Sequence, residues 1–273
     1  RVVLATPDPN PYVNGKGILI LKKHGIQVDV GLLKKEASLL NEKYIIFMRT
    51  GRPFIHLKIA QSLDGRIATQ EGQSRWITNE NALKTVHRLR SEYDAVLVGI
   101  KTVIKDNPSL TVRHLAGRNP FRIILDDKLV IPENARVISD KGINRTIIFT
   151  TVEENDPGFA RLSRRGIRLI QVGRTESGYI NLPEVMAHLA TLNITSLLVE
   201  GGGEVFTSFI KSRLFDKITF FIAPMMIGTG IQSIGDLNIT SLEEATRLQD
   251  VQIDIIDNQA VITGYQNFES ITG

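Results

Sequence analysis

The sequence of 273 residues contains no cysteine. This absence excludes disulfide bonds, zinc sites with thiolate ligands and cysteine nucleophiles. The five histidines are scattered, and none of them begins a His-x-Glu pair, so we expect no metal site in this chain. A Ser-His-Asp signature and a nucleophile elbow are also missing, which argues against a serine hydrolase.

Long hydrophobic runs are absent as well. The longest apolar run, over residues 220–227, is interrupted by Pro224 and is far shorter than the roughly 18 residues of a membrane span. No signal peptide opens the chain. We therefore expect a cytoplasmic protein that does not associate with membranes.

The charge of the chain is mixed, with 33 Lys and Arg against 29 Asp and Glu. The net charge of +4 is spread along the sequence rather than clustered, so we expect no nucleic-acid binding. A mild basic excess is compatible with small anionic ligands such as phosphorylated metabolites, although a solvated basic surface explains it equally well. A hydrophobic content of 42% suffices for one large core and a smaller unit.

The first 50 residues predict a small α/β unit. Because the chain starts at Arg1 and enters directly into a strand, we expect it to be part of a longer protein. Glycine and proline at residues 50–53 mark a boundary, which divides the chain into units at 1–50 and 51–273. The expected elements of the first unit are strands at 2–5 and 26–31 and helices at 17–23 and 32–49.

Strands and helices alternate in the second unit, which predicts an α/β fold with a largely parallel sheet. Two alternating runs around Asp257 predict a C-terminal hairpin, and hence antiparallel strands at one edge of the sheet. The expected strands lie at 54–62, 95–100, 121–127, 145–151, 167–173, 196–200 and 218–224, and the expected helices at 78–93 and 182–194.

Three consecutive glycines follow the strand at 196–200, in the stretch Glu200-Gly201-Gly202-Gly203-Glu204. Such a loop leaves backbone N–H groups uncovered, and the helix after it adds a positive dipole end, so the loop favours an anion such as a phosphate. The spacing is not the GxGxxG fingerprint, which argues against a standard Rossmann site. A purely structural tight turn explains the glycines about equally well.

Three further stretches combine turn signals with polar side chains. They are AQSLDGR at 60–66, GQSRWIT at 72–78 and GIKTVIKDNPSLTVR at 99–113. The first reads equally as an ordinary Asp-Gly turn, and the single tryptophan of the second is more often a packing residue. In the third, polar side chains follow the end of a strand, where parallel sheets bind ligands. Arg90 and Arg113 could form a fork for a phosphate, or both could be surface arginines.

Taken together, these motifs resemble the reductase half of the bifunctional riboflavin-biosynthesis deaminase/reductase. KIAQSLDGRIA, GQSRWIT, GIKTVIKDNPSLTVR and LLVEGGGEVFTSFI match the family's motifs in order, from about Gly51 to the C-terminus. The first 50 residues resemble the last third of the family's deaminase domain, a cytidine-deaminase-like α/β unit. The zinc motif of that domain (His-x-Glu, then Pro-Cys and a second Cys) is absent, so deamination cannot be claimed for this chain.

The resemblance implies a dihydrofolate-reductase-like fold and NADPH-dependent reduction of the ribosyl group of 5-amino-6-(5-phosphoribosylamino)uracil. Zinc would belong only to the missing deaminase part. Hydride transfer also needs a proton, for which Lys58 and Asp64 are our catalytic candidates. The implied cofactor contacts are Ala60, Trp76, Thr102, Asp106, Asp127, Gly202, Gly203, Glu204, Val205, Phe206, Thr207 and Ser208. The implied substrate contacts are Ser74, Arg90, Leu110, Arg113 and Glu200.

Two alternatives stay open at this point. The same fold could act on another substrate, as dihydrofolate reductase does, although paired arginines favour a phosphorylated substrate. The chain could also be a nucleotide-binding remnant without activity, which the intact motifs argue against. The resemblance further implies a homo-oligomer, either a dimer or a larger assembly.

Overall fold

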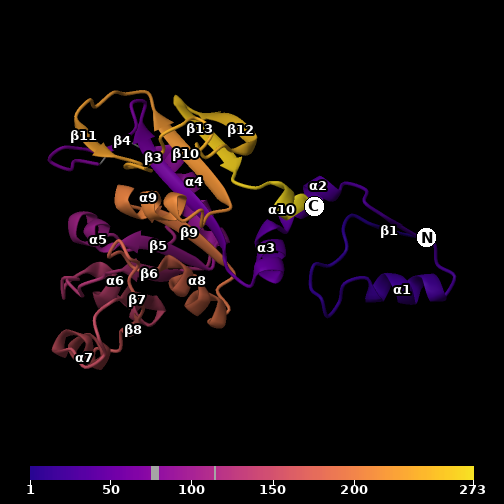
Figure 1. Cartoon of the computed structure of the whole chain (residues 1–273), viewed down its shortest axis with the longest axis horizontal. Helices are drawn as coiled ribbons and strands as arrows, with labels where there is room; N and C mark the ends of the chain where they lie inside the picture. Colours follow the sequence, from indigo (N-terminus) through magenta and orange to yellow (C-terminus); the bar gives the residue numbers. More distant parts are fainter. Residues whose placement is uncertain (75–79, 114) are drawn as a thin grey trace.

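The structure is a computed structural model that describes residues 1–74, 80–113 and 115–273. A nine-stranded sheet forms its main body, and a smaller two-stranded unit extends from it at the N-terminus (Figure 1). The strands of the large sheet are β3 (Phe54–Ser62), β5 (Ala95–Gly99), β6 (Phe121–Leu125), β7 (Thr146–Thr150), β8 (Arg168–Gln171), β9 (Ser196–Gly201), β10 (Lys217–Ala223), β12 (Gln249–Ile256) and β13 (Gln259–Tyr265).

The strand order across the sheet is β12-β13-β10-β3-β9-β5-β6-β7-β8. All neighbours from β10 to β8 pair in parallel, whereas β13 runs antiparallel to both β10 and β12. This arrangement confirms the predicted α/β class, the mainly parallel mixed sheet and the C-terminal hairpin.

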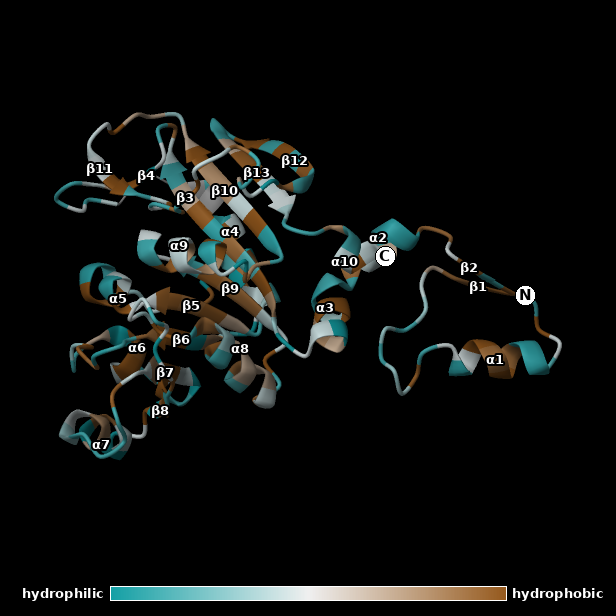
Figure 2. Ribbon diagram, in the orientation of Figure 1, coloured by the Kyte–Doolittle hydropathy of each residue, from teal (hydrophilic) through white to brown (hydrophobic). Residues whose placement is uncertain are grey.

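Helices cover both faces of the sheet, which is why its central strands are apolar on both sides (Figure 2). Residues of α8 (Leu182–Thr191) and α9 (Gly203–Lys211) share one core cluster with the side chains of β3, β5 and β9 that point to that face. On the opposite face, α5 (Ile100–Asp106), α6 (Arg136–Ser139) and α7 (Pro157–Arg164) pack on β5, β6 and β7. Helix α4 (Glu80–Glu92) lies on this second side as well, where Leu89 joins Leu198.

The N-terminal unit contains β1 (Val2–Leu4) and β2 (Val28–Val30), which pair in parallel around α1 (Lys16–Lys23). The expected helix at 32–49 is wrong as a single element. It is divided at Asn41 into α2 (Lys34–Leu40) and α3 (Glu42–Thr50). The Asn41 carboxamide donates to the carbonyl of Ala37, a side-chain bond that competes with the helical pattern.

Helix α3 packs against the main body, and its Tyr44 hydroxyl also donates to Asp8 of the N-terminal unit. Its Ile46 is buried with Phe54 and Leu198, and its Glu42 accepts hydrogen bonds from Lys217 and Tyr265. The predicted division of the chain at residue 50 stays a prediction, and α3 belongs physically to the core of the larger unit.

Several short elements were not expected from the sequence. Helix α5 continues β5 directly and was not among the expected helices. Two short strands, β4 (Arg66–Thr69) and β11 (Gly230–Gln232), pair antiparallel with each other although they are far apart in the chain. The other unexpected elements are the helices α6, α7 and α10 (Glu269–Thr272), the 3-10 turn η1 (Ile143–Arg145) and an isolated β-bridge between Arg174 and Ile180, after β8.

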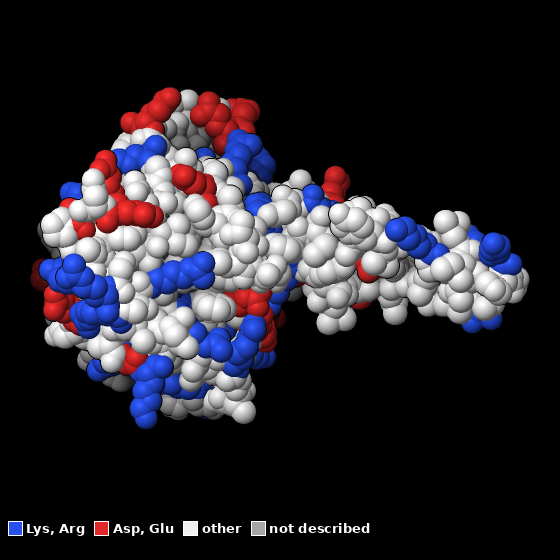
Figure 3. Space-filling view, turned by 90° about the horizontal axis from the view of Figure 1, so that it is seen from below, with Lys and Arg blue, Asp and Glu red and all other residues white. Residues whose placement is uncertain are grey.

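The surface of the main body mixes both signs of charge on the face shown in Figure 3, and the narrow N-terminal arm is mostly uncharged there. Among the described residues, no helix is long and apolar enough to cross a membrane.

Candidate functional site

Three of the four motifs meet where the parallel strands β3, β5 and β9 end. The glycine loop after β9 is short, because Gly203 already begins α9 and only Gly202 has a positive φ, of 89°. Thr102, in the first turn of α5, packs on this loop. Its Oγ1 lies 3.2 Å and 3.4 Å from the positions that a Cβ would take at Gly201 and Gly202. The structure therefore brings together Thr102 and the glycines, as the resemblance implies.

Helix α9 begins without a side-chain cap, so its first backbone N–H groups face the loop without an intrahelical acceptor. Beyond the first turn the side chains serve the fold. Phe206 is buried in the core, and the Thr207 hydroxyl donates to the carbonyl of Gly203 while it accepts from the N–H of Gly235. Glu204 is exposed and forms an ion pair with Lys101. The anion-binding potential of this segment thus lies in its backbone, at residues 202–205.

The 232–235 segment covers the start of α9. A Cβ at Gly203 would overlap the carbonyl oxygen of Gln232, and Thr207 holds the N–H of Gly235 at 2.7 Å. Sequence reasoning missed this segment, which is joined to β4 through β11. The only signal for it was the pair of glycines at 228 and 230 after the end of β10.

Replacing Gly203 with alanine is expected to lower the free energy of unfolding by about 1–3 kcal/mol, because the new methyl group must displace backbone rather than a flexible side chain. Urea denaturation measures this change. Gly17→Ala is the matched control, since Gly17 lies in helix α1 with no atom within 4 Å of its Cβ position. Equal stabilities of the two variants would contradict the close contact at Gly203.

A buried ion pair joins α4 to the end of β9. The guanidinium of Arg90 donates to both carboxylate oxygens of Glu200, at 2.6 Å and 2.8 Å, and the side chains are only 12% and 6% exposed. Burial raises the pKa of Glu200, but the charge and hydrogen bonds of Arg90 outweigh it and lower this pKa to about 2. Glu200 is therefore a fixed anion at neutral pH.

The geometry of Arg90 does not fit the hypothesis of a phosphate fork made by two arginines. Its remaining terminal nitrogen donates to the carbonyl of Thr111 at 3.2 Å, so all three nitrogens of its guanidinium contact protein acceptors. Arg113 differs, because its exposed guanidinium has no hydrogen-bond or ion-pair partner within residues 1–74, 80–113 and 115–273. Only its backbone N–H is engaged, by His87.

Lys58 completes a polar cluster with this pair, which we call the Lys58–Arg90–Glu200 cluster. Its side chain projects from β3 on the same sheet face as Glu200, because Leu57 pairs with Val199 and side chains alternate along both strands. Lys58 is only 8% exposed, and burial lowers the pKa of its ammonium although the charge of Glu200 opposes the shift. In the described part of the chain its Nζ has no hydrogen-bond partner, and it lies 5.9 Å from the ring centroid of Phe221.

Asp64 lies in the turn after β3 and makes its contacts outside the Lys58–Arg90–Glu200 cluster. Its carboxylate accepts hydrogen bonds from the Ser62 hydroxyl and from the N–H groups of Ile227 and Gly228. These bonds, that of Ser62 foremost, lower the pKa of Asp64 to about 2. Such a carboxylate holds no proton to donate near neutral pH. The geometry favours an anchoring role for Asp64 on the 227–228 loop, and its catalytic role remains only a prediction.

The other predicted residues are placed unevenly. Ser74 contacts Asp106, with 3.5 Å between their side-chain oxygens, which joins the second and third motifs. Leu110 is buried with a positive φ of 52°, and Ala60 packs against Phe221. Asp127, beyond β6, forms an ion pair with Arg174. Trp76 lies outside the described residues.

No group of three or more His, Cys, Asp or Glu side chains is arranged to hold a metal ion in the described ranges. One buried polar atom at the end of β3 also lacks a partner there, the Oε1 of Gln61. In the sequence Gln61 lies between two predicted site residues, Ala60 and Asp64. Gln61 itself was not predicted as a site residue.

Residues 53–262 match the family model described as the RibD C-terminal domain. The chain belongs to this family. The Riboflavin biosynthesis protein RibD of Aquifex aeolicus is 43% identical over 263 residues, which cover 96% of this chain and 71% of that protein. RibD of Bacillus amyloliquefaciens is 42% identical over 266 residues, with the same coverage of both proteins.

Solved structures of the family are similar over almost the whole chain. RibD of Acinetobacter baumannii superposes with a TM-score of 0.83 at 28% identity, over 96% of this chain and 72% of that one. A diaminohydroxyphosphoribosylaminopyrimidine deaminase/5-amino-6-(5-phosphoribosylamino)uracil reductase from Thermotoga maritima gives a TM-score of 0.81 at 32% identity, over 97% and 71%. The riboflavin biosynthesis reductase Rib7 of Saccharomyces cerevisiae shares the fold at 20% identity, with a TM-score of 0.63.

Proposed function

We propose that this chain uses NADPH to reduce the ribosyl group of 5-amino-6-(5-phosphoribosylamino)uracil to a ribityl chain. The observation that carries the proposal is the Lys58–Arg90–Glu200 cluster. The cluster lies next to the uncapped start of α9, because Glu200 directly precedes the glycines of the loop. Membership in the RibD C-terminal domain family supports this reaction.

The residues around α9 fit a pyridine dinucleotide. The uncapped N-terminus of α9 suits a phosphate, and Gly202 leaves the loop open to backbone contact. In the proposal, residues 202–208, Thr102 and Asp106 hold the cofactor, with further contacts from Ala60, Trp76 and Asp127. When bound, NADPH supplies the hydride.

The substrate lies, in the proposal, against the opposite side of the same loop. Glu200 accepts hydrogen bonds from its sugar or base, Arg90 fixes the orientation of Glu200, and Arg113 binds the phosphate. Ser74 and Leu110 complete the contacts. The glycine loop would then bring hydride donor and acceptor together, which reduces the entropy cost of their reaction.

The Nζ of Lys58 is the proposed proton donor. It protonates the ring oxygen of the ribose as the C1–O bond breaks, which leaves a protonated imine between C1 and the exocyclic nitrogen. A hydride from the bound cofactor would neutralise this cation at C1, and the product would be the secondary amine of the ribityl chain. Burial lowers the pKa of Lys58 and so makes its ammonium a better acid.

Binding of the cofactor is expected to stabilise the protein. NADPH at about one hundred times its dissociation constant should raise the free energy of unfolding by about 2.7 kcal/mol. Thermal unfolding with NADPH, with NADH and without nucleotide measures this shift. If neither nucleotide shifts the transition, both reductase hypotheses fail.

Turnover separates the remaining hypotheses. Loss of NADPH absorbance with the deaminated aminouracil substrate, but not with dihydrofolate, would support the proposed reaction, and the reverse would support a dihydrofolate-reductase-like activity. The expected homo-oligomer stays a prediction, which light scattering after size exclusion tests.

A further inference from the structure

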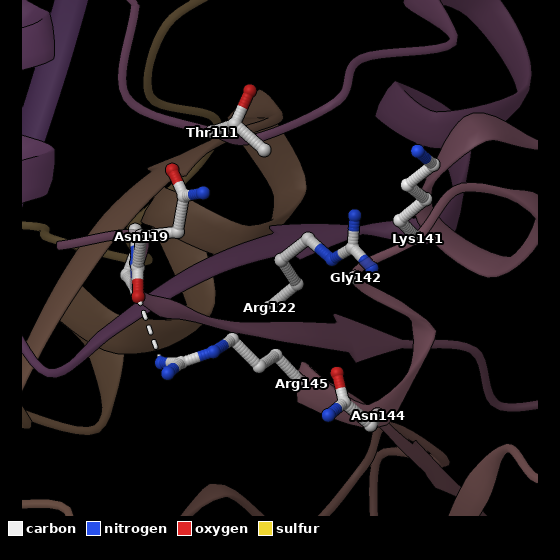
Figure 4. Close-up of a pocket in the computed structure, with 8 residues that line it drawn as sticks. Thr111, Asn119, Arg122, Lys141, Gly142, Asn144 and Arg145 are labelled. Carbon is white, nitrogen blue, oxygen red and sulfur yellow. Dashed lines mark hydrogen bonds between the residues drawn. The ribbon is translucent and has the colours of Figure 1, made fainter.

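A basic pocket of about 250 Å³ lies at the amino ends of β6 and β7 (Figure 4). Because the strands are parallel, this is the edge opposite to the glycine loop and the end of β9. The pocket is lined by Thr111, Asn119, Pro120, Arg122, Lys141, Gly142, Asn144 and Arg145.

Three cationic side chains and two carboxamides surround this pocket, and none of the eight described lining residues is acidic. Among the residues that the structure describes, Asp140 is the one carboxylate that contacts a lining cation, through the Nη1 of Arg122. Lys141 is exposed and forms no ion pair within the described residues. The guanidinium of Arg145 lines the pocket, and its Nη1 donates to the carbonyl of Asn119 at 3.0 Å. The pocket therefore has an excess of positive charge and of N–H donors.

Arg122 is the buried part of the pocket, with only 2% of the residue exposed. Its Nε donates to Thr146, and its Nη1 donates to Asp140 and, at 3.4 Å, to the carbonyl of Ser109. Its Nη2 has no hydrogen-bond partner in the described part of the structure. A buried donor without a partner is costly, and a small shift of the guanidinium toward a bound acceptor removes the cost.

The backbone of Gly142 lies close to this nitrogen. A Cβ at Gly142 would lie 3.1 Å from the Nη2 of Arg122. The backbone of Gly142 has an ordinary φ of −98°, so its conformation does not require glycine. The missing side chain lets the backbone approach the guanidinium closely, and Figure 4 shows the Arg122 side chain directed toward Gly142.

We infer that this pocket binds a small phosphate-bearing anion at a site separate from the proposed active site. Arginine, lysine and carboxamide donors around a cavity match the acceptor oxygens of a phosphate. The pocket and the proposed substrate site share the 109–113 segment as a wall, because Ser109 accepts from Arg122 and Thr111 accepts from Arg90.

Titration with inorganic phosphate, followed by ³¹P NMR and by thermal unfolding, tests this inference. The double variant Lys141→Gln/Arg145→Gln is expected to weaken phosphate binding at least tenfold. Gly142→Ala, which keeps every charge, is expected to weaken it as well, because its methyl group would lie 3.1 Å from the Nη2 of Arg122 and displace the guanidinium. Arg164→Gln removes an exposed cation of α7 and is the matched control, with binding unchanged.

Two further measurements separate this pocket from other sources of phosphate binding. Arg113→Gln should leave the half-saturating phosphate concentration unchanged, and loss of binding in this variant would overturn the inference in favour of the active site. Sodium chloride at equal ionic strength should give no saturable shift, and an equal shift would reduce the effect to screening.

Ribose 5-phosphate that binds more tightly than inorganic phosphate would identify a phosphate ester as the ligand, and weaker binding would identify the free ion. Unchanged phosphate binding in both pocket variants would refute the site.

Discussion

Replacing Glu200 with glutamine is expected to lower the free energy of unfolding by about 3 kcal/mol and to abolish most reductase turnover. Glutamine keeps the shape of the side chain but leaves the guanidinium of Arg90 buried opposite a neutral group. Removing one partner of a buried pair typically costs about 3–5 kcal/mol because the other charge stays uncompensated. Urea denaturation at neutral pH measures the stability, and NADPH oxidation measures the turnover.

Glu204→Gln is the control for this variant, because Glu204 forms an ion pair whose two side chains are 75% and 67% exposed. Exposed pairs contribute at most about 1 kcal/mol, so this variant should unfold almost like the parent chain. A similar loss of unfolding free energy in both variants would show that the burial of Glu200 does not cause the destabilisation.

The Arg90–Glu200 ion pair also predicts how the stability of the protein changes with pH. Since the pKa of Glu200 is lowered from 4.5 to about 2, its contribution to stability is complete above its unfolded pKa. The contribution is lost as the pH falls from about 4.5 through 2. Glu200→Gln lacks this part of the acid dependence, so its stability should fall less steeply than that of the parent chain over this range.

Replacing Lys58 with methionine is expected to reduce kcat by about 10²–10⁴-fold while the fold is retained. Methionine fills much of the same volume, and removing a buried cation whose pKa is lowered by burial removes an unfavourable charge. Stability should therefore stay equal or rise, in contrast to Glu200→Gln. Steady-state kinetics with separate kcat and KM values, and the pH profile of kcat, measure the effect.

Lys43→Met is the matched control for Lys58. Lys43 lies on α3, its pKa is also lowered by burial, and its Nζ donates to the carbonyl of Glu92 away from the cluster. Its replacement should leave kcat unchanged. If Lys58→Met retained full turnover, Lys58 would not be the proton donor, and if only KM changed, Lys58 would bind substrate without supplying a proton.

The large elements of the fold were predictable because their sequence patterns are long. β5 is a continuous apolar run, β7 has three apolar residues between two threonines, and the Asp257 turn between alternating strands predicts the hairpin. The division at Asn41 was missed, because apolar residues keep helical spacing across it and only the Asn41 side chain disturbs the backbone. Short strands such as β4 and β11 carry too few residues for a pattern, and their pairing depends on tertiary contacts.

The candidate site was predictable in its location but not in its pairings. The motif order placed Thr102, Glu200 and the glycines together, and the structure shows Thr102 packed on Gly201 and Gly202. The sequence could not show that Arg90 contacts Glu200, because 110 residues separate them and either could instead face a ligand. The same holds for Asp64, because its partners at 227–228 follow the neighbouring strand β10 but lie 163 residues further along the chain at Ile227.

The central position of β3 has a consequence for how the chain folds during synthesis. β3 is the first strand of the large sheet to leave the ribosome, yet both of its neighbours, β9 and β10, are among the later ones. Strands β5 to β8 pair with their sequence neighbours and need no later residue to do so. The nascent chain must therefore keep an apolar strand with two unpaired edges until the last third of the chain emerges. Such non-local pairing slows folding and exposes the strand to aggregation in the meantime.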